Sequence, residues 1–270
     1  MARAKESAAE RAEETGKDLP EDDVEMGFFS HLRELRVRVV RALWGLIPGI
    51  GLGWYFREEI FSALVRPFTR AWTALGLEGT PNLIILNPVD AFVVYLKIAV
   101  VTGIALGAPW LFWQLWGFIA PGLYRRERRL ALPFVLMSTL FFLGGVAFGY
   151  EIVFPIAFEY FLGFSGQLPG GVNLEAQYSI SEILTLELRL LIAFGLVFEI
   201  PVIISFLAAA RIVNWKQLLK FGRWWVLIAA VLSALLTPPD VGSQLLMLGP
   251  LVALYFISIV LAFILGEKKV

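Results

Sequence analysis

Residues 190–210 read LLIAFGLVFEIPVIISFLAAA, an apolar run long enough to cross a membrane. A helix needs about 20 apolar residues to cross the hydrocarbon layer of about 30 Å. Similar runs recur along a chain that is 58% hydrophobic, and they predict an all-α integral membrane protein with six transmembrane helices. The expected spans are 37–56, 91–118, 130–152, 186–209, 224–237 and 242–265.

The fifth expected span is short. Fourteen residues lie between Arg223 and Pro238, and they give about 21 Å of helix at 1.5 Å per residue. Either the bilayer is locally thinned around this span, or the helix begins below the interface.

Lysine and arginine are distributed unequally between the two sets of connections, which sets the expected orientation. Counted from residue 28 onward, fourteen of these residues fall on the side of the two termini, against three on the other side. The three are Arg57, Arg66 and Arg70. Both termini are therefore expected to lie on the cytoplasmic side, and the protein is expected in the cytoplasmic (inner) membrane.

Outside the spans, two kinds of segment are expected. Residues 1–27 contain nine acidic residues and few large apolar ones, which predicts a disordered acidic tail before the membrane domain, 28–266. A short basic tail, 267–270, follows it. On the outer face, the segments REEIFSALVRPFTRAWTAL and IVFPIAFEYFLGF are expected to form short capping helices.

The composition argues against several kinds of catalytic site. Cysteine is absent and His31 is the single histidine, so disulfides, a histidine-built metal site and a Ser-His-Asp triad are not expected. No P-loop occurs. We therefore expect no enzyme activity, no metal and no cofactor.

Glycines recur at four-residue spacing in three spans, a spacing that lets helices approach closely in lipid. We interpret them as packing positions. They are Gly45/Gly49/Gly53, Gly103/Gly107 and Gly145/Gly149.

Two cytoplasmic carboxylates invite two interpretations. Glu34 lies four residues before Arg38, so the two can pair on a solvated helix face, and Glu127 stands among four arginines in YRRERR, where it can relieve charge repulsion. Alternatively, both carboxylates form a receptor for a ligand with two arginines, because each guanidinium binds a carboxylate through two hydrogen bonds.

The segment SALLTPPDVGSQLL, 233–246, joins the last two spans. Its two prolines force a sharp turn. We expect Asp240 to cap the following helix and Gln244 to seek a partner across a helix interface.

Glu199 lies near the middle of the run quoted first, two residues before Pro201. It is either a neutral carboxyl bonded to the Val197 carbonyl that Pro201 leaves free, or a functional group. We expect it to face a lipid- or water-lined recess. Lys97, Glu187 and Arg189 are expected to snorkel or pair near the outer ends of their spans.

Taken together, these segments resemble the TatC family, the multispanning subunits of the twin-arginine protein translocase. The resemblance covers about residues 28–266 and rests on HLRELRVR, PVDAFVVYLK, FIAPGLYRRERR, AFGYEIVFPIAF, FGLVFEIPV and LLTPPDVGSQ, in that order.

The resemblance implies a curved, glove-like wall of six helices that binds twin-arginine signal peptides of folded proteins. It implies TatA- and TatB-type single-span partners, self-association and export driven by the proton-motive force. The signal-peptide residues would be Glu34, Glu127, Arg36, Arg38 and Phe118.

Other family positions follow from the same motifs. Thr237 and Gln244 would dock a partner span, and Glu199 would be the intramembrane polar site on the concave side. Pro67 in the outer loop and Asp240 would be structural.

A second hypothesis is a proton-coupled small-solute transporter with Glu199 as proton carrier. The cytoplasmic carboxylate pair and the missing internal repeat argue against it. Neither reading involves nucleic acid.

Overall fold

A computed structural model describes residues 28–77, 79–119, 131–167, 173–174 and 177–267. The chain divides into two compact units, residues 1–38 and 39–270, and helix α2 (Phe28–Tyr55) runs through the boundary between them. The expected acidic tail, 1–27, lies outside the described residues, as do residues 268–270 of the basic tail.

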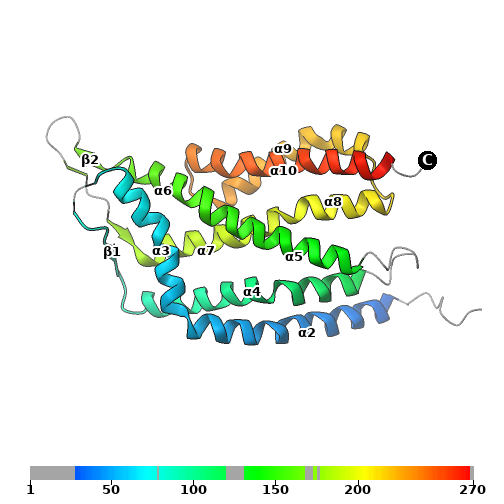
Figure 1. The fold of residues 1–270 in the computed structure, drawn as a ribbon, viewed down its shortest axis with the longest axis horizontal. Helices are drawn as coiled ribbons and strands as arrows, with labels where there is room; N and C mark the ends of the chain where they lie inside the picture. Colours follow the sequence, from blue (N-terminus) through cyan, green and yellow to red (C-terminus); the bar gives the residue numbers. More distant parts are fainter. Residues whose placement is uncertain (1–27, 78, 120–130, 168–172, 175–176, 268–270) are drawn as a thin grey trace, which may run out of the picture. The chain divides into compact units, whose positions relative to one another are not determined.

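The described residues are predominantly helical, as expected (Figure 1). After α2 the elements are α3 (Arg57–Ala74), α4 (Asp90–Ile119), α5 (Ala131–Phe148), the π-helix η3 (Gly149–Val153), α6 (Phe154–Leu162), α7 (Ile180–Val197), α8 (Glu199–Ala209), α9 (Trp215–Leu236) and α10 (Val241–Glu267). By length and composition, five described helical segments could cross a membrane, or six if α2 and α3, which meet at a 76° bend, are counted together.

Three of the expected spans have different bounds in the structure. The third runs from Leu132 to Leu162 and the fourth from Ile180 to Ala209. The segment IVFPIAFEYFLGF is therefore not a separate capping helix. It continues α5 through η3 into α6, because Pro155 stands in the first turn of α6, where a missing N–H is tolerated.

The fifth span was expected to be short, yet α9 has 22 residues. Asn214 begins it with a capping box: its side chain accepts from the helix backbone while Oε1 of Gln217 accepts from the Asn214 backbone N–H, at 2.9 Å. The helix therefore begins before the apolar run, and this cap stabilises its charged first turns.

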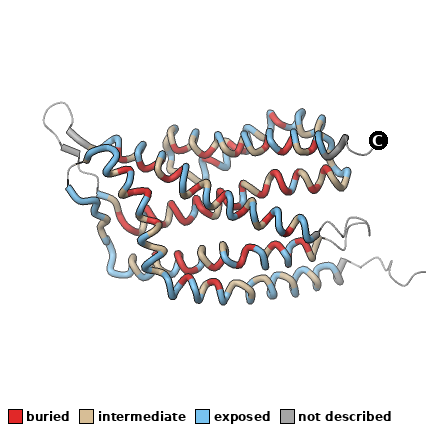
Figure 2. Tube along the Cα trace, in the orientation of Figure 1, coloured by how far each residue is buried: buried red, intermediate tan, exposed pale blue. Residues whose placement is uncertain are grey.

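Helix α7 lies at the centre of the second unit. Of the apolar window of α7 and α8, 61% is buried, against 17% for α9, and Figure 2 shows this difference along the chain. The main core joins α7 to buried side chains of α3, α4, η3, α6 and α10. A smaller aromatic cluster lies between α4, α5 and α8.

Close helix approach at glycines is confirmed for α2 and α4. A Cβ added to Gly49 would lie 3.1 Å from the Cα of Gly103, and one added to Gly103 would lie 2.8 Å from the backbone nitrogen of Ile50. A larger side chain at either position would therefore push the two helices apart.

Two short strands align the starts of α4 and α7. Strand β1 (Leu83–Ile84) pairs in parallel with β4 (Tyr178–Ser179), so Leu83 lies opposite Tyr178. A second two-stranded pair joins β2 (Gly166–Gln167) to β3 (Asn173–Leu174). Because α4 follows β1 and α7 follows β4, both helices begin at the same end of the unit and run in the same direction.

Candidate functional site

The first candidate site is the charged turn of α2. Oε1 of Glu34 accepts two hydrogen bonds from Arg38, at 2.8 Å from Nε and 2.7 Å from Nη2. Both side chains are about one quarter exposed, 23% for Glu34 and 24% for Arg38. The expected i,i+4 pair is thus confirmed. Among the described residues no hydrogen bond reaches Oε2 of Glu34, so this oxygen can accept from a ligand.

The other residues of the expected signal-peptide site are less completely placed. Arg36 is exposed on α2, and Phe118 is half-buried near the end of α4. Glu127 lies outside the described residues, so the two-carboxylate receptor stays a prediction.

The second candidate site is the turn between α9 and α10. Oγ1 of Thr237 donates to the Ser233 carbonyl at 2.8 Å, and Nε2 of Gln244 donates to the Ala230 carbonyl of α9 at 3.3 Å. Gln244 therefore has a hydrogen-bond partner on the neighbouring helix, as the sequence predicted. Within the described chain its amide oxygen has no donor, so the turn presents free acceptors.

Asp240 holds this turn in place, as expected. Its carboxylate accepts from the backbone N–H of Ser243 at 2.7 Å and also from the Ser243 hydroxyl. Asp240 immediately precedes α10, so it satisfies one of the free N–H groups at the helix start.

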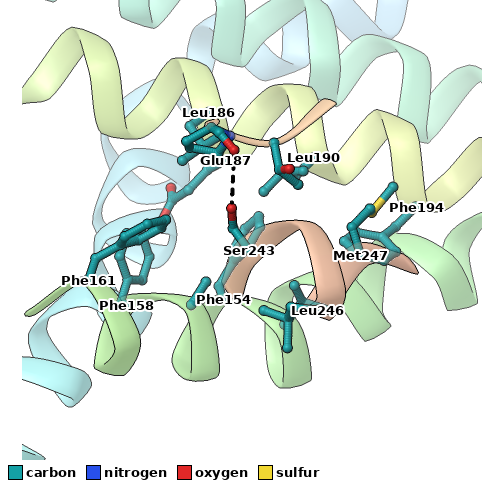
Figure 3. A pocket seen from close by; sticks show the side chains of 14 residues that line it. Phe154, Phe158, Phe161, Leu186, Glu187, Leu190, Phe194, Ser243, Leu246 and Met247 are labelled. Carbon is teal, nitrogen blue, oxygen red and sulfur yellow. Dashed lines mark hydrogen bonds between the residues drawn. The ribbon is translucent and has the colours of Figure 1, made fainter. Parts of the chain in front are cut away.

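A small cavity lies beside the same turn and is lined by Glu187 of α7 (Figure 3). Thr237, Pro238 and Ser243 line it together with apolar side chains of α6, α7 and α10. Its volume is about 20 Å³, which is enough for about one water molecule.

Glu187 itself was wrongly expected to snorkel or pair. Its side chain is 1% exposed, and neither carboxylate oxygen has a hydrogen-bond partner among the described residues. The physical reason is its position on the most buried helix, where it faces the interior and not an interface with water. Lys97 of α4 does find a partner, because its Nζ donates to Oγ1 of Thr185 at 2.8 Å.

Glu199 does not face a recess, so that expectation is wrong. Its side chain is 5% exposed, and its Oε1 has no hydrogen-bond partner among the described residues. The Ser138 side chain and the Phe142 backbone of α5 are its polar neighbours. The Ser138 hydroxyl also accepts from Nε1 of Trp116 at 3.2 Å. The carboxyl therefore lies in a buried polar region between α4, α5 and α8, beside polar groups of α5.

Pro67 has a structural role that the sequence only outlined. It lies inside α3 and is buried. Because proline has no backbone N–H, it cannot donate a hydrogen bond to the carbonyl of Ala63 four residues earlier. The hydroxyl of Tyr150 in η3 donates to that carbonyl at 2.7 Å. Sequence analysis missed Tyr150, although the unpaired carbonyl predicts that a donor is needed.

No cluster of three or more histidine, cysteine, aspartate or glutamate side chains in the described ranges could hold a metal ion. The two candidate sites offer acceptors and charged groups at the ends of apolar helices. This arrangement defines a polytopic α-helical membrane protein.

Comparisons with known proteins identify the family. The model of the family described as Sec-independent protein translocase protein (TatC) matches residues 30–250. A TatC protein of Desulforapulum autotrophicum is 41% identical over 90% of this chain and 86% of its own length. One of Aquifex aeolicus is 34% identical over 90% of this chain and 98% of its own.

Solved structures agree with this result. A crystal structure described as twin arginine translocase receptor TatC superposes with a TM-score of 0.76 at 33% identity, and it covers 88% of this chain and 100% of the other. The chain therefore belongs to the TatC family.

Proposed function

We propose that this chain is a component of the Sec-independent protein translocase and the subunit that binds twin-arginine signal peptides of folded proteins. Family membership over residues 30–250, a range that includes both candidate sites, carries this proposal. The transporter alternative has no support from the relatives, which are named as translocase proteins.

Glu34 is the proposed contact for one signal-peptide arginine, and Glu127 for the other. Glu34 already binds one guanidinium, that of Arg38, through a single oxygen. Its second oxygen can take an arginine from outside without breaking this pair. Arg36, Arg38 and Phe118 complete the proposed site, with Arg38 fixing the carboxylate in position.

Thr237 and Gln244 are the proposed docking site for a single-span partner of the TatA or TatB type. Thr237 and Gln244 use their donor groups within the chain, so the acceptor oxygens remain for a partner. The partner span should therefore bring a donor, such as an amide or a protonated carboxyl, into the membrane.

The remaining features follow from the same assignment. Both termini would be on the cytoplasmic side of the inner membrane, where Glu34 and Glu127 meet signal peptides before export. The protein would act as a receptor and scaffold without catalysis, associate with other copies and with lipid, and use the proton-motive force through the assembled translocase.

A binding experiment with the purified, full-length protein tests the receptor assignment. A labelled signal peptide should bind when it carries two arginines and not when they are replaced by two lysines. Glu34→Gln and Glu127→Gln should each weaken binding about 10- to 100-fold, because one charge-assisted contact contributes about 1.5–3 kcal/mol. Glu59→Gln, at an exposed position of α3, is the matched control. Unchanged affinity in the double variant would refute these roles.

Cross-linking in membranes tests the docking site. The chain has no cysteine, so a cysteine introduced at Thr237 or Gln244 is the single thiol of the protein. It should cross-link to the partner span, whereas one at Leu140, which is 66% exposed on α5, should not. Equal cross-linking at all three positions would show that no specific site exists there.

A further inference from the structure

A groove between α4 and α7 is lined by two basic side chains and shares no lining residue with the cavity described above. Lys97 of α4 and Arg189 of α7 line a groove of about 310 Å³. Its other walls are Thr185 and the aliphatic side chains of Leu96, Val100, Val101, Leu188 and Ile192.

The groove lies within the membrane-spanning part of both helices. Lys97 follows the first residue of α4 by seven residues, and Arg189 follows the first residue of α7 by nine. At 1.5 Å per residue these positions are about 10 and 14 Å along helices that begin side by side. The groove therefore opens toward the leaflet at which α4 and α7 begin.

The positive charge of the groove is not neutralised by the described residues. Lys97 donates to the Thr185 hydroxyl at 2.8 Å, which orients the ammonium group but leaves its charge. Arg189 is exposed, and among the described ion pairs neither cation has an acidic partner.

The nearest carboxylate in sequence also leaves this charge unbalanced. Glu187 precedes Arg189 by two residues, so their side chains point to opposite sides of α7. Glu187 is buried and lines the other cavity. Glu182, in the first turn of α7, likewise lines a different pocket and not this groove.

We propose that this groove binds the phosphate of an anionic phospholipid through Lys97 and Arg189. A guanidinium binds phosphate through two parallel hydrogen bonds, and the ammonium group adds a point charge. Basic pockets between transmembrane helices are suited to anionic headgroups. The aliphatic walls select a lipid over a soluble anion, because an acyl chain can lie along Leu96, Val100 and Ile192.

Lipid binding to the delipidated, purified protein in neutral detergent tests the proposal by native mass spectrometry. Phosphatidylglycerol should bind more tightly than phosphatidylcholine. The double variant Lys97→Gln/Arg189→Gln should bind phosphatidylglycerol about tenfold more weakly or worse. The control variant Lys220→Gln/Arg223→Gln removes the same charge from exposed positions of α9 and should bind as the wild type does.

Two further measurements separate the possible ligands. Val100→Trp fills the groove without changing its charge, so it should also weaken phosphatidylglycerol binding. Inorganic phosphate at millimolar concentration should not displace the lipid. Displacement by phosphate, equal binding of both lipids, equal losses in both double variants or unchanged binding by Val100→Trp would each overturn the proposal.

Discussion

Replacing Glu187 with methionine should stabilise the protein. The carboxyl is 1% exposed and neither oxygen has a partner among the described residues. Leaving one buried polar group without a hydrogen bond costs about 1–3 kcal/mol. Methionine has a similar length and no polar group, and its flexible chain suits an irregular cavity wall. We therefore expect the free energy of unfolding to rise by about 1–3 kcal/mol.

The assay is thermal unfolding in detergent, followed by the fluorescence of the nine tryptophans at a fixed scan rate. A gain of 1 kcal/mol raises the Tm of a domain of comparable size by roughly 2–4 °C, so the expected shift is roughly 2–12 °C. Glu187→Gln keeps two polar groups in the same place and should gain less. Glu182→Met, at an exposed position of the same helix, should change the Tm little.

A lower Tm for Glu187→Met would refute this reasoning. It would mean that a group outside the chain satisfies the carboxyl, and the adjacent cavity of about 20 Å³ has room for one water molecule to do so. Breaking that contact would then cost more than the desolvation that methionine relieves.

Three other changes have defined outcomes. Gly103→Ala should lower the free energy of unfolding by about 1–3 kcal/mol, because the added Cβ would lie 2.8 Å from the backbone of Ile50. Gly144→Ala is the control, since Gly144 has open space around it, and equal Tm values for the two variants would refute the close approach. Arg211 follows the last residue of α8 by two residues and has a φ of 58°, so Arg211→Gly should stabilise the protein by about 1 kcal/mol in the same assay. A lower stability would show that the Arg211 side chain contributes more than its backbone strain costs. Glu199→Gln should retain most export activity and Glu199→Ala should lose more, without loss of signal-peptide binding; equal loss in both variants would indicate that ionisation matters.

The spans and the close helix contacts could be predicted from sequence because both depend on local patterns. Apolar length locates a helix in a membrane whatever it packs against, and glycine spacing marks a surface that a neighbouring backbone can approach. The pair of Glu34 and Arg38 was likewise predictable, since residues four apart meet on any helix.

The buried faces could not be predicted in the same way. The last eight residues of α7, 190–197, are apolar on every side, so they do not distinguish the face toward other helices from the face toward lipid. Glu187 and Arg189 received the same expectation because both lie near the outer end of their span, although one is buried and the other exposed. For α9, the alternative of a start below the interface is the one that the structure confirms, because the helix begins at Trp215 after the capping pair Asn214 and Gln217.

The π-helical turn at Gly149–Val153 has an evolutionary consequence. Such a turn fits one more residue into a helix than regular α-helical winding would. Four α-helical residues turn the chain by about 400°, and the five residues of this π-helix turn it by about as much, so deleting one residue there would restore α-helical winding and leave α6 facing the same side of α5. The side chains of Phe154 and Phe158 would therefore keep their buried faces. A single-residue deletion at this point should be tolerated in descendants of this chain more readily than one in the middle of α7, where it would rotate every following side chain by about 100°.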